Sequence, residues 1–218
     1  MIKAVIFDLD GTLVDSEPLH KVTRDNLLKK LGLFSEELSK NAVGISKRDF
    51  WAEVSKANGL KLDGNELTVE EFKDLLDLVV ERNVKLTVGA VKLLEYLKSK
   101  GIKMAVASSS DEFYVNGLLK FVGIREYFDT VCGGDMVEKA KPFPDVYLKA
   151  LKLLNASAKE TLGVEDSNTG MKAVNNAGLT CIGCSANAVN VCGDYSSCYA
   201  VVDDLSKIIE IIKNLNNN

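Results

Sequence analysis

Acidic side chains stand at two places where a buried strand is expected to end. Asp8 and Asp10 follow the first apolar run of the chain, and Glu165 and Asp166 follow a later one. Carboxylates that converge repel one another, so they persist together only with a counter-charge, most simply a divalent cation. An all-oxygen ligand set with an open water shell suits Mg²⁺. The sequence therefore predicts Mg²⁺ as the cofactor.

Hydroxyl groups and a lysine follow two further apolar segments. Ser108, Ser109 and Ser110 come after one of them, and Lys141 lies in the loop after another. Taken singly, such residues are common in turns, helix caps and solvated loops. A serine and a lysine beside a divalent cation would instead suit a phosphate group, and it is the joint placement at strand ends that indicates a site.

The elements that must position these residues alternate between strands and helices. Apolar runs predict strands at 2–7, 102–107, 130–132, 161–164, 180–182 and 199–202. Periodic patterns predict helices at 88–100, 111–121, 145–154, 168–177 and 205–215. This alternation predicts right-handed βαβ units and an α/β, Rossmann-like parallel sheet with helices on both faces. Ligands of such sheets bind beyond the carboxyl ends of the strands, where the polar residues above are expected.

A helical block interrupts this alternation directly after the first strand. We expect helices at 18–31, 35–42, 46–57 and 68–84, with no strand among them. The predicted organisation is a core domain formed by residues 1–15 and 86–218 and an inserted α-helical cap domain formed by residues 16–85.

Composition excludes several classes of protein. The 218 residues carry a net charge of -4, which argues against nucleic acid as a partner because phosphate backbones need a basic face. No apolar run is long enough to span a bilayer, and no signal peptide is evident. We expect a cytoplasmic protein with no membrane partner, and a monomer by default. The single histidine, His20, excludes chemistry that needs a histidine pair.

The cysteines give a weaker signal. Five are present, and the odd count favours free thiols. A structural zinc site is a minor alternative, suggested by the spacing of the run CIGC, with two further cysteines after it: Cys181, Cys184, Cys192 and Cys198.

Four segments in order resemble the motifs of the haloacid dehalogenase superfamily. The run DLDGTLVDS resembles its first motif, and Ala107-Ser108 its second. Lys141-Pro142 resembles the third, and the run EDSNTG, which begins at Glu165, resembles the fourth. The helical insertion is similar to the small cap of the β-phosphoglucomutase-like and phosphoglycolate phosphatase-like branch.

The resemblance implies a role for each matching residue. Asp8 would be the nucleophile that forms an aspartyl-phosphate, and Asp10 the general acid and then the general base. Asp8, the backbone carbonyl of Asp10 and Asp166 would bind the metal, with Glu165 acting on it through water. The phosphate-binding residues would be Ser108, Lys141 and, through its backbone N–H, Ser109. Thr12 would support the loop after the nucleophile.

The inserted cap is expected to close over the site and to set substrate specificity. Lys47 and Arg48, at a predicted helix start, are candidates for contact with substrate, although a capped helix with exposed cations fits the same pattern. His20 falls where relatives place a histidine near the acid/base aspartate; a surface position is the alternative.

Two reactions share this machinery. We favour a Mg²⁺-dependent phosphatase of small phosphomonoesters, such as a sugar phosphate or similar phosphorylated metabolite. The runner-up is a β-phosphoglucomutase-type mutase, in which a sugar hydroxyl replaces water. A catalytically idle binding protein is a remote alternative, because every catalytic position is filled.

Overall fold

The computed structural model describes residues 1–42, 45–187 and 194–217. The chain forms two compact units, one made of Met1–Asp15 with Lys85–Asn218 and the other of Ser16–Val84. We call them the core unit and the helical unit, and describe each by itself.

A parallel sheet organises the core unit. The strand order is β3-β2-β1-β4-β5-β6, and all neighbouring strands run parallel. The strands are β1 (Ala4–Phe7), β2 (Lys103–Ala107), β3 (Thr130–Cys132), β4 (Thr161–Glu165), β5 (Thr180–Cys184) and β6 (Ala200–Val202). Every residue of β1 is buried, as expected of a central strand that is covered on both faces. Each strand lies within the range that the sequence predicts or overlaps it closely.

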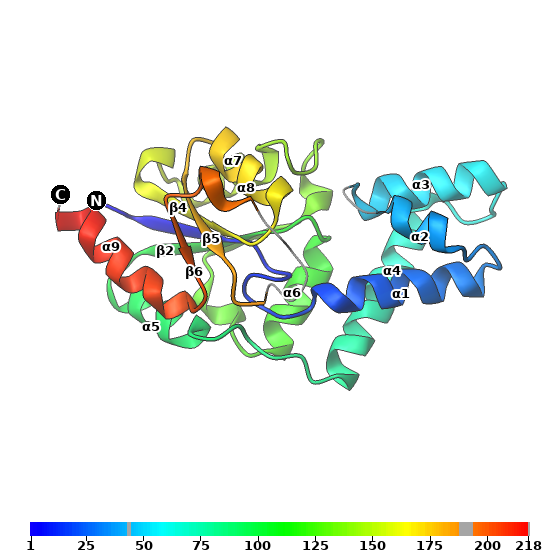
Figure 1. Cartoon of the computed structure of the whole chain (residues 1–218), viewed down its shortest axis with the longest axis horizontal. Helices are drawn as coiled ribbons and strands as arrows, with labels where there is room; N and C mark the ends of the chain where they lie inside the picture. The colour runs from blue at the N-terminus through cyan, green and yellow to red at the C-terminus, as the bar shows by residue number, and fades with distance from the viewer. Residues whose placement is uncertain (43–44, 188–193, 218) are drawn as a thin grey trace. The chain divides into compact units, whose positions relative to one another are not determined.

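Helices cover both faces of this sheet (Figure 1). They are α5 (Ala90–Ser99), α6 (Glu112–Phe121), α7 (Asp145–Leu154), α8 (Asn168–Asn176) and α9 (Ile208–Asn217). Helices α7 and α8 lie on one face and α5 and α9 on the other. One hydrophobic cluster joins buried residues of α7 and α8 to the inner strands, including Ile6, Ala105 and Tyr147. The predicted α/β, Rossmann-like fold is confirmed.

The helical unit contains α1 (Glu17–Lys30), α2 (Glu36–Asn41), α3 (Lys47–Asn58) and α4 (Gly64–Glu81). Its hydrophobic core gathers residues of α1, α3 and α4, among them Leu27, Trp51 and Leu67. Trp51 is fully buried, so it is part of this core.

Most helix ends lie within one or two residues of the sequence prediction, but the starts of α4 and α9 differ by more. Helix α4 begins at Gly64 and not at residue 68, because Asp63 and Glu66 form a capping box that starts the helix earlier. The closing helix begins at Ile208, after a 3₁₀ turn over Leu205–Lys207 that Asp204 caps. Among the described helices, none combines the length and apolar character needed to cross a membrane.

Candidate active site

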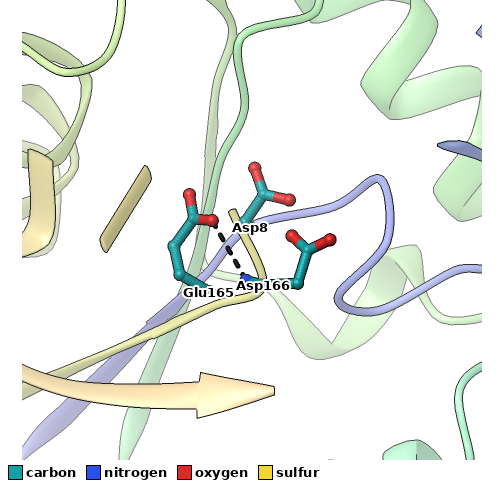
Figure 2. A group of neighbouring side chains, drawn as sticks. All are labelled: Asp8, Glu165 and Asp166. Carbon is teal, nitrogen blue, oxygen red and sulfur yellow. Dashed lines mark hydrogen bonds between the residues drawn. The ribbon is translucent and has the colours of Figure 1, made fainter. Parts of the chain in front are cut away.

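The nucleophile candidate Asp8 lies at the carboxyl end of β1. Its backbone N–H donates to the carbonyl of Val164 on β4, at 2.9 Å, so the two strand ends are joined at this point. Asp8, Glu165 and Asp166 each offer a carboxylate oxygen, and these atoms lie within 4.8 Å of one another. Figure 2 shows the three carboxylates gathered where β1 and β4 end. Residues far apart in the sequence therefore meet at one edge of the sheet.

Lys141 forms ion pairs with two of these carboxylates. Its Nζ lies 2.6 Å from Asp8 Oδ1 and 2.6 Å from Glu165 Oε1. It also donates to the carbonyl oxygen of Ala107, the last residue of β2, at 3.0 Å. Burial opposes the charge on Lys141, but the Asp8 and Glu165 carboxylates outweigh this effect and raise its pKa. Lys141 is therefore a permanent cation at this site.

The environment of Asp8 disfavours its negative charge. Burial raises the pKa of Asp8 well above its usual value; Lys141 opposes this, while Glu165 and Asp166 add to it. Lys141 pairs with Asp8 and Glu165, and the carboxylate of Asp166 adds a third negative charge beside them. A divalent cation among these oxygens would supply further positive charge and hold Asp8 ionised.

Glu165 is fully buried and accepts hydrogen bonds at both oxygens. Oε1 accepts from Lys141 and from the Tyr147 hydroxyl, at 2.6 and 2.9 Å. Oε2 accepts from the backbone N–H of Asp166 and from both the N–H and the hydroxyl of Ser167. A Cβ on Gly170 would lie 1.9 Å from Oε1, so only glycine leaves room for this carboxylate. Both oxygens of Glu165 are thus occupied by hydrogen bonds, one set from Lys141 and Tyr147 and the other from the turn that follows β4.

Asp166 is oriented by the loop that follows the nucleophile. The Thr12 hydroxyl donates to Asp166 Oδ1 at 3.1 Å, and Thr12 is fully buried. Gly11 has a φ of 85°, and a Cβ there would lie 2.1 Å from Asp166 Oδ2. Glycine is therefore required for both the backbone conformation and the close approach of the carboxylate.

The carboxylate of Asp10 has different partners from that of Asp8. It accepts a hydrogen bond from the Tyr114 hydroxyl at Oδ1, at 2.9 Å, and one from the Ser110 hydroxyl at Oδ2, at 3.1 Å. The sequence indicates Ser110 only as one of three serines that follow a strand, and it does not point to Tyr114. Tyr114 follows Ser110 by four residues, which places both near the start of α6, but in an apolar helix a tyrosine is indistinguishable from a core residue.

The two predicted phosphate-binding serines differ in exposure. Ser108 is buried at the end of β2, and its Oγ accepts from the backbone N–H of Ser110 at 3.0 Å. Ser109 is exposed, and its carbonyl lies against Gly134, where a Cβ would come within 2.4 Å. The close backbone packing fixes the turn that carries both serines.

The three predicted cap residues lie in the helical unit. His20 is on α1, and Lys47 and Arg48 begin α3. Lys47 forms an ion pair with Glu71, a fully buried carboxylate of α4. Their roles toward substrate stay predictions.

Within the part of the chain that the structure describes, the acidic group is the one set of three or more potential metal ligands. Cys132, Cys181, Cys184 and Cys198 are free thiols, and burial raises the pKa of Cys132 and Cys184 to about 11. The described cysteines do not form a zinc site, and Cys192 lies outside the described residues.

The family model for haloacid dehalogenase-like hydrolases matches residues 5–184. The chain belongs to the haloacid dehalogenase-like hydrolase family. The matched segment contains all four motifs and the whole acidic site.

Relatives within this family include phosphatases, and similar solved structures include a phosphomutase. A phosphorylated carbohydrates phosphatase of Thermotoga maritima is 32% identical and is aligned over 82% of each chain. A phosphoglycolate phosphatase of Pseudomonas fluorescens is 31% identical over 84% of this chain and 69% of its own. The crystal structure of a β-phosphoglucomutase from Clostridium difficile superposes with a TM-score of 0.79 at 25% identity, covering 100% of this chain and 98% of that one. This haloacid dehalogenase-like hydrolase is accordingly an enzyme of the phosphatase class.

Proposed function

We propose that this enzyme hydrolyses small phosphorylated carbohydrates and similar phosphomonoesters through an aspartyl-phosphate at Asp8. The observation that carries the proposal is the convergence of three carboxylates within 4.8 Å, with Lys141 bound to Asp8. Phosphatase relatives at 31–32% identity support the substrate class.

Asp8 is the nucleophile in this proposal. Its carboxylate oxygen forms a bond to phosphorus while the bond from phosphorus to the ester oxygen breaks, and water later hydrolyses the acyl phosphate. Lys141, already paired with Asp8, reduces the repulsion between the carboxylate and the dianionic phosphate. Ser108 and the backbone N–H of Ser109 would bind phosphoryl oxygens beside it.

The donor set fits Mg²⁺. The cation would be held by Asp8, the backbone carbonyl of Asp10 and Asp166. Glu165 would stay in the outer position, because both of its oxygens already accept hydrogen bonds from the protein. When bound, Mg²⁺ offsets charge that develops on the phosphoryl group and keeps Asp8 in its ionised form.

Asp10 would move the protons. It protonates the ester oxygen as the alcohol leaves, and it then removes a proton from the water that attacks the aspartyl-phosphate. Its carboxylate accepts hydrogen bonds from two hydroxyl groups and lies outside the group of carboxylates that gathers around Asp8. The two aspartates are thus placed in separate environments, as separate roles require.

The helical unit would select the substrate, with His20, Lys47 and Arg48 as candidates for contact. The structural similarity to a β-phosphoglucomutase supports mutase activity as the second candidate. In that reaction a sugar hydroxyl resolves the aspartyl-phosphate instead of water.

The test is Mg²⁺-dependent release of phosphate from p-nitrophenyl phosphate, with Asp8→Asn as the inactive variant. Wild-type activity in Asp8→Asn would refute the assignment of the nucleophile.

The mutase candidate is tested with β-glucose 1-phosphate and a trace of glucose 1,6-bisphosphate. Rapid formation of glucose 6-phosphate that depends on the bisphosphate would favour it over hydrolysis. A screen of phosphorylated metabolites then identifies the substrate.

A further inference from the structure

The hydroxyl groups of Ser110 and Tyr114 donate hydrogen bonds to the two oxygens of the Asp10 carboxylate. Tyr114 donates to Oδ1 at 2.9 Å and Ser110 donates to Oδ2 at 3.1 Å. The donors are 104 and 100 residues away from Asp10 in the sequence. The contact therefore exists only because the loop after β1 and the start of α6 meet in the folded core unit.

The surroundings of Tyr114 hold its hydroxyl in a fixed place. Tyr114 is fully buried on α6, and its neighbours Val115 and Leu118 on the same helix are buried too. A tyrosine ring enclosed in this way has little freedom to move, and its hydroxyl needs a polar partner inside the protein. A carboxylate that accepts from it is oriented by a rigid element.

Ser110 is fixed mainly through its backbone. Its N–H donates to Ser108 Oγ at 3.0 Å, and its carbonyl accepts from the N–H of Gly134 at 2.9 Å. Its hydroxyl can still rotate about the Cβ–Oγ bond. The two donors differ in where they stand, since Tyr114 lies on a regular helix and Ser110 lies in the turn before it.

We propose that Tyr114 is a positioning residue for catalysis, one that orients the Asp10 carboxyl group toward the ester oxygen of the substrate. The proposal rests on the proposed function, in which Asp10 is the general acid. As the bond from phosphorus to the ester oxygen breaks and the Asp8–phosphorus bond forms, the proton passes from Asp10 to the departing oxygen. The hydrogen bond from Tyr114 fixes the position of Oδ1, and with it the direction in which the carboxyl group presents its proton.

The test compares two substrates that differ in how much they need an acid. Phenyl phosphate and p-nitrophenyl phosphate have similar shapes, but the nitrophenolate leaves readily without a proton. In Tyr114→Phe we expect kcat/KM to fall about tenfold for phenyl phosphate and about twofold or less for p-nitrophenyl phosphate. The parameter kcat/KM is used because it reports the steps up to formation of the aspartyl-phosphate.

Three further variants make the result specific. Tyr127→Phe removes a hydroxyl from the 3₁₀ turn over Arg125–Tyr127 and should leave both substrates unaffected. Ser110→Ala removes the second donor and should show the same dependence on leaving group. In an Asp10→Asn background, adding Tyr114→Phe should produce no further loss, since the group it orients is already gone.

An equal loss for both substrates would overturn the proposal, because it would show a general structural role. No loss for either substrate would also overturn it, as would a full additional loss in the Asp10→Asn background. Failure of the proposed function gives a different result: Asp8→Asn would then retain activity. Thermal melting of each variant reports whether its fold is intact.

Discussion

Lys141 and Asp8 form a buried ion pair, with 2.6 Å between Nζ and Oδ1. The lysine side chain is only 5% exposed and is shared with Glu165, which is fully buried. Burying a charged side chain lowers the stability of the folded state unless a group of opposite charge is paired with it. The site is therefore held together by electrostatic balance as much as by the sheet that carries it.

Removing the lysine should damage both activity and stability. Lys141→Met leaves Asp8 and Glu165 buried without their common counter-charge, so we expect the free energy of unfolding to fall by about 3–5 kcal/mol in urea titrations. Activity toward p-nitrophenyl phosphate should fall by about a hundredfold or more. The control is Lys139→Met, an exposed lysine two residues earlier, which should change neither. Unchanged stability in Lys141→Met would contradict the buried ion pair.

Asp8→Asn should be inactive and yet more stable than the wild type when no divalent cation is present. Burial and two neighbouring carboxylates raise the pKa of Asp8 in the folded state, so its ionisation costs stability at pH values above the unfolded-state pKa. The gain in melting temperature should therefore be clear at pH 7, shrink as the pH falls toward the unfolded-state pKa of aspartate, and vanish at about pH 3, where the side chain is largely protonated in both states. A variant that melts below the wild type at pH 7 would show that the ion pair outweighs the crowding.

Asp166→Asn should weaken the response to Mg²⁺. The variant keeps the size of the side chain but removes one of the charges that attract the cation. We expect the Mg²⁺ concentration for half-maximal activity to rise about tenfold or more, and the rise in melting temperature on adding Mg²⁺ to shrink. Asp203→Asn, which changes an exposed aspartate paired with Lys207, is the matched control. An unchanged Mg²⁺ titration in Asp166→Asn would remove it from the ligand set.

Glu71 should be essential to the helical unit. Its buried carboxylate accepts from Trp51 Nε1 at 2.5 Å and forms an ion pair with Lys47. Glu71→Ala should lower the free energy of unfolding by about 3 kcal/mol, because both partners lose a buried acceptor. Glu70→Ala removes only a pair with Lys30, whose side chain is 68% exposed, and should cost less than about 1 kcal/mol. Equal effects from the two variants, compared by urea unfolding, would argue against a structural role for the buried network.

The starts of two helices differ in how clearly the local sequence marks them. The start of α4 at Gly64 was readable from Asp63 and Glu66, whose spacing is that of a capping box. The 3₁₀ turn at Leu205–Lys207 has no comparable signal in the periodic apolar pattern, which continues through it. The periodic apolar pattern predicts that a closing helix is present, but it does not show that the first turn of this segment is 3₁₀.

The sequence by itself determined the sheet and the positions of its polar strand ends. Buried strands need continuous apolar runs, and the residues that follow parallel strands must meet at one edge. Order and type thus indicate which strand ends carry polar residues, and the resemblance to the haloacid dehalogenase motifs implies Asp8, Ser108, Lys141 and Asp166 among them.

Only the tertiary structure decided which partner holds which carboxylate. Glu165 and Asp166 are adjacent, yet one accepts from Lys141 and Tyr147 while the other accepts from Thr12. Tyr114 and Asp10 are 104 residues apart in the sequence. Such contacts depend on the direction in which a side chain leaves a strand end or helix start, and a pattern of apolar and polar residues does not contain that direction.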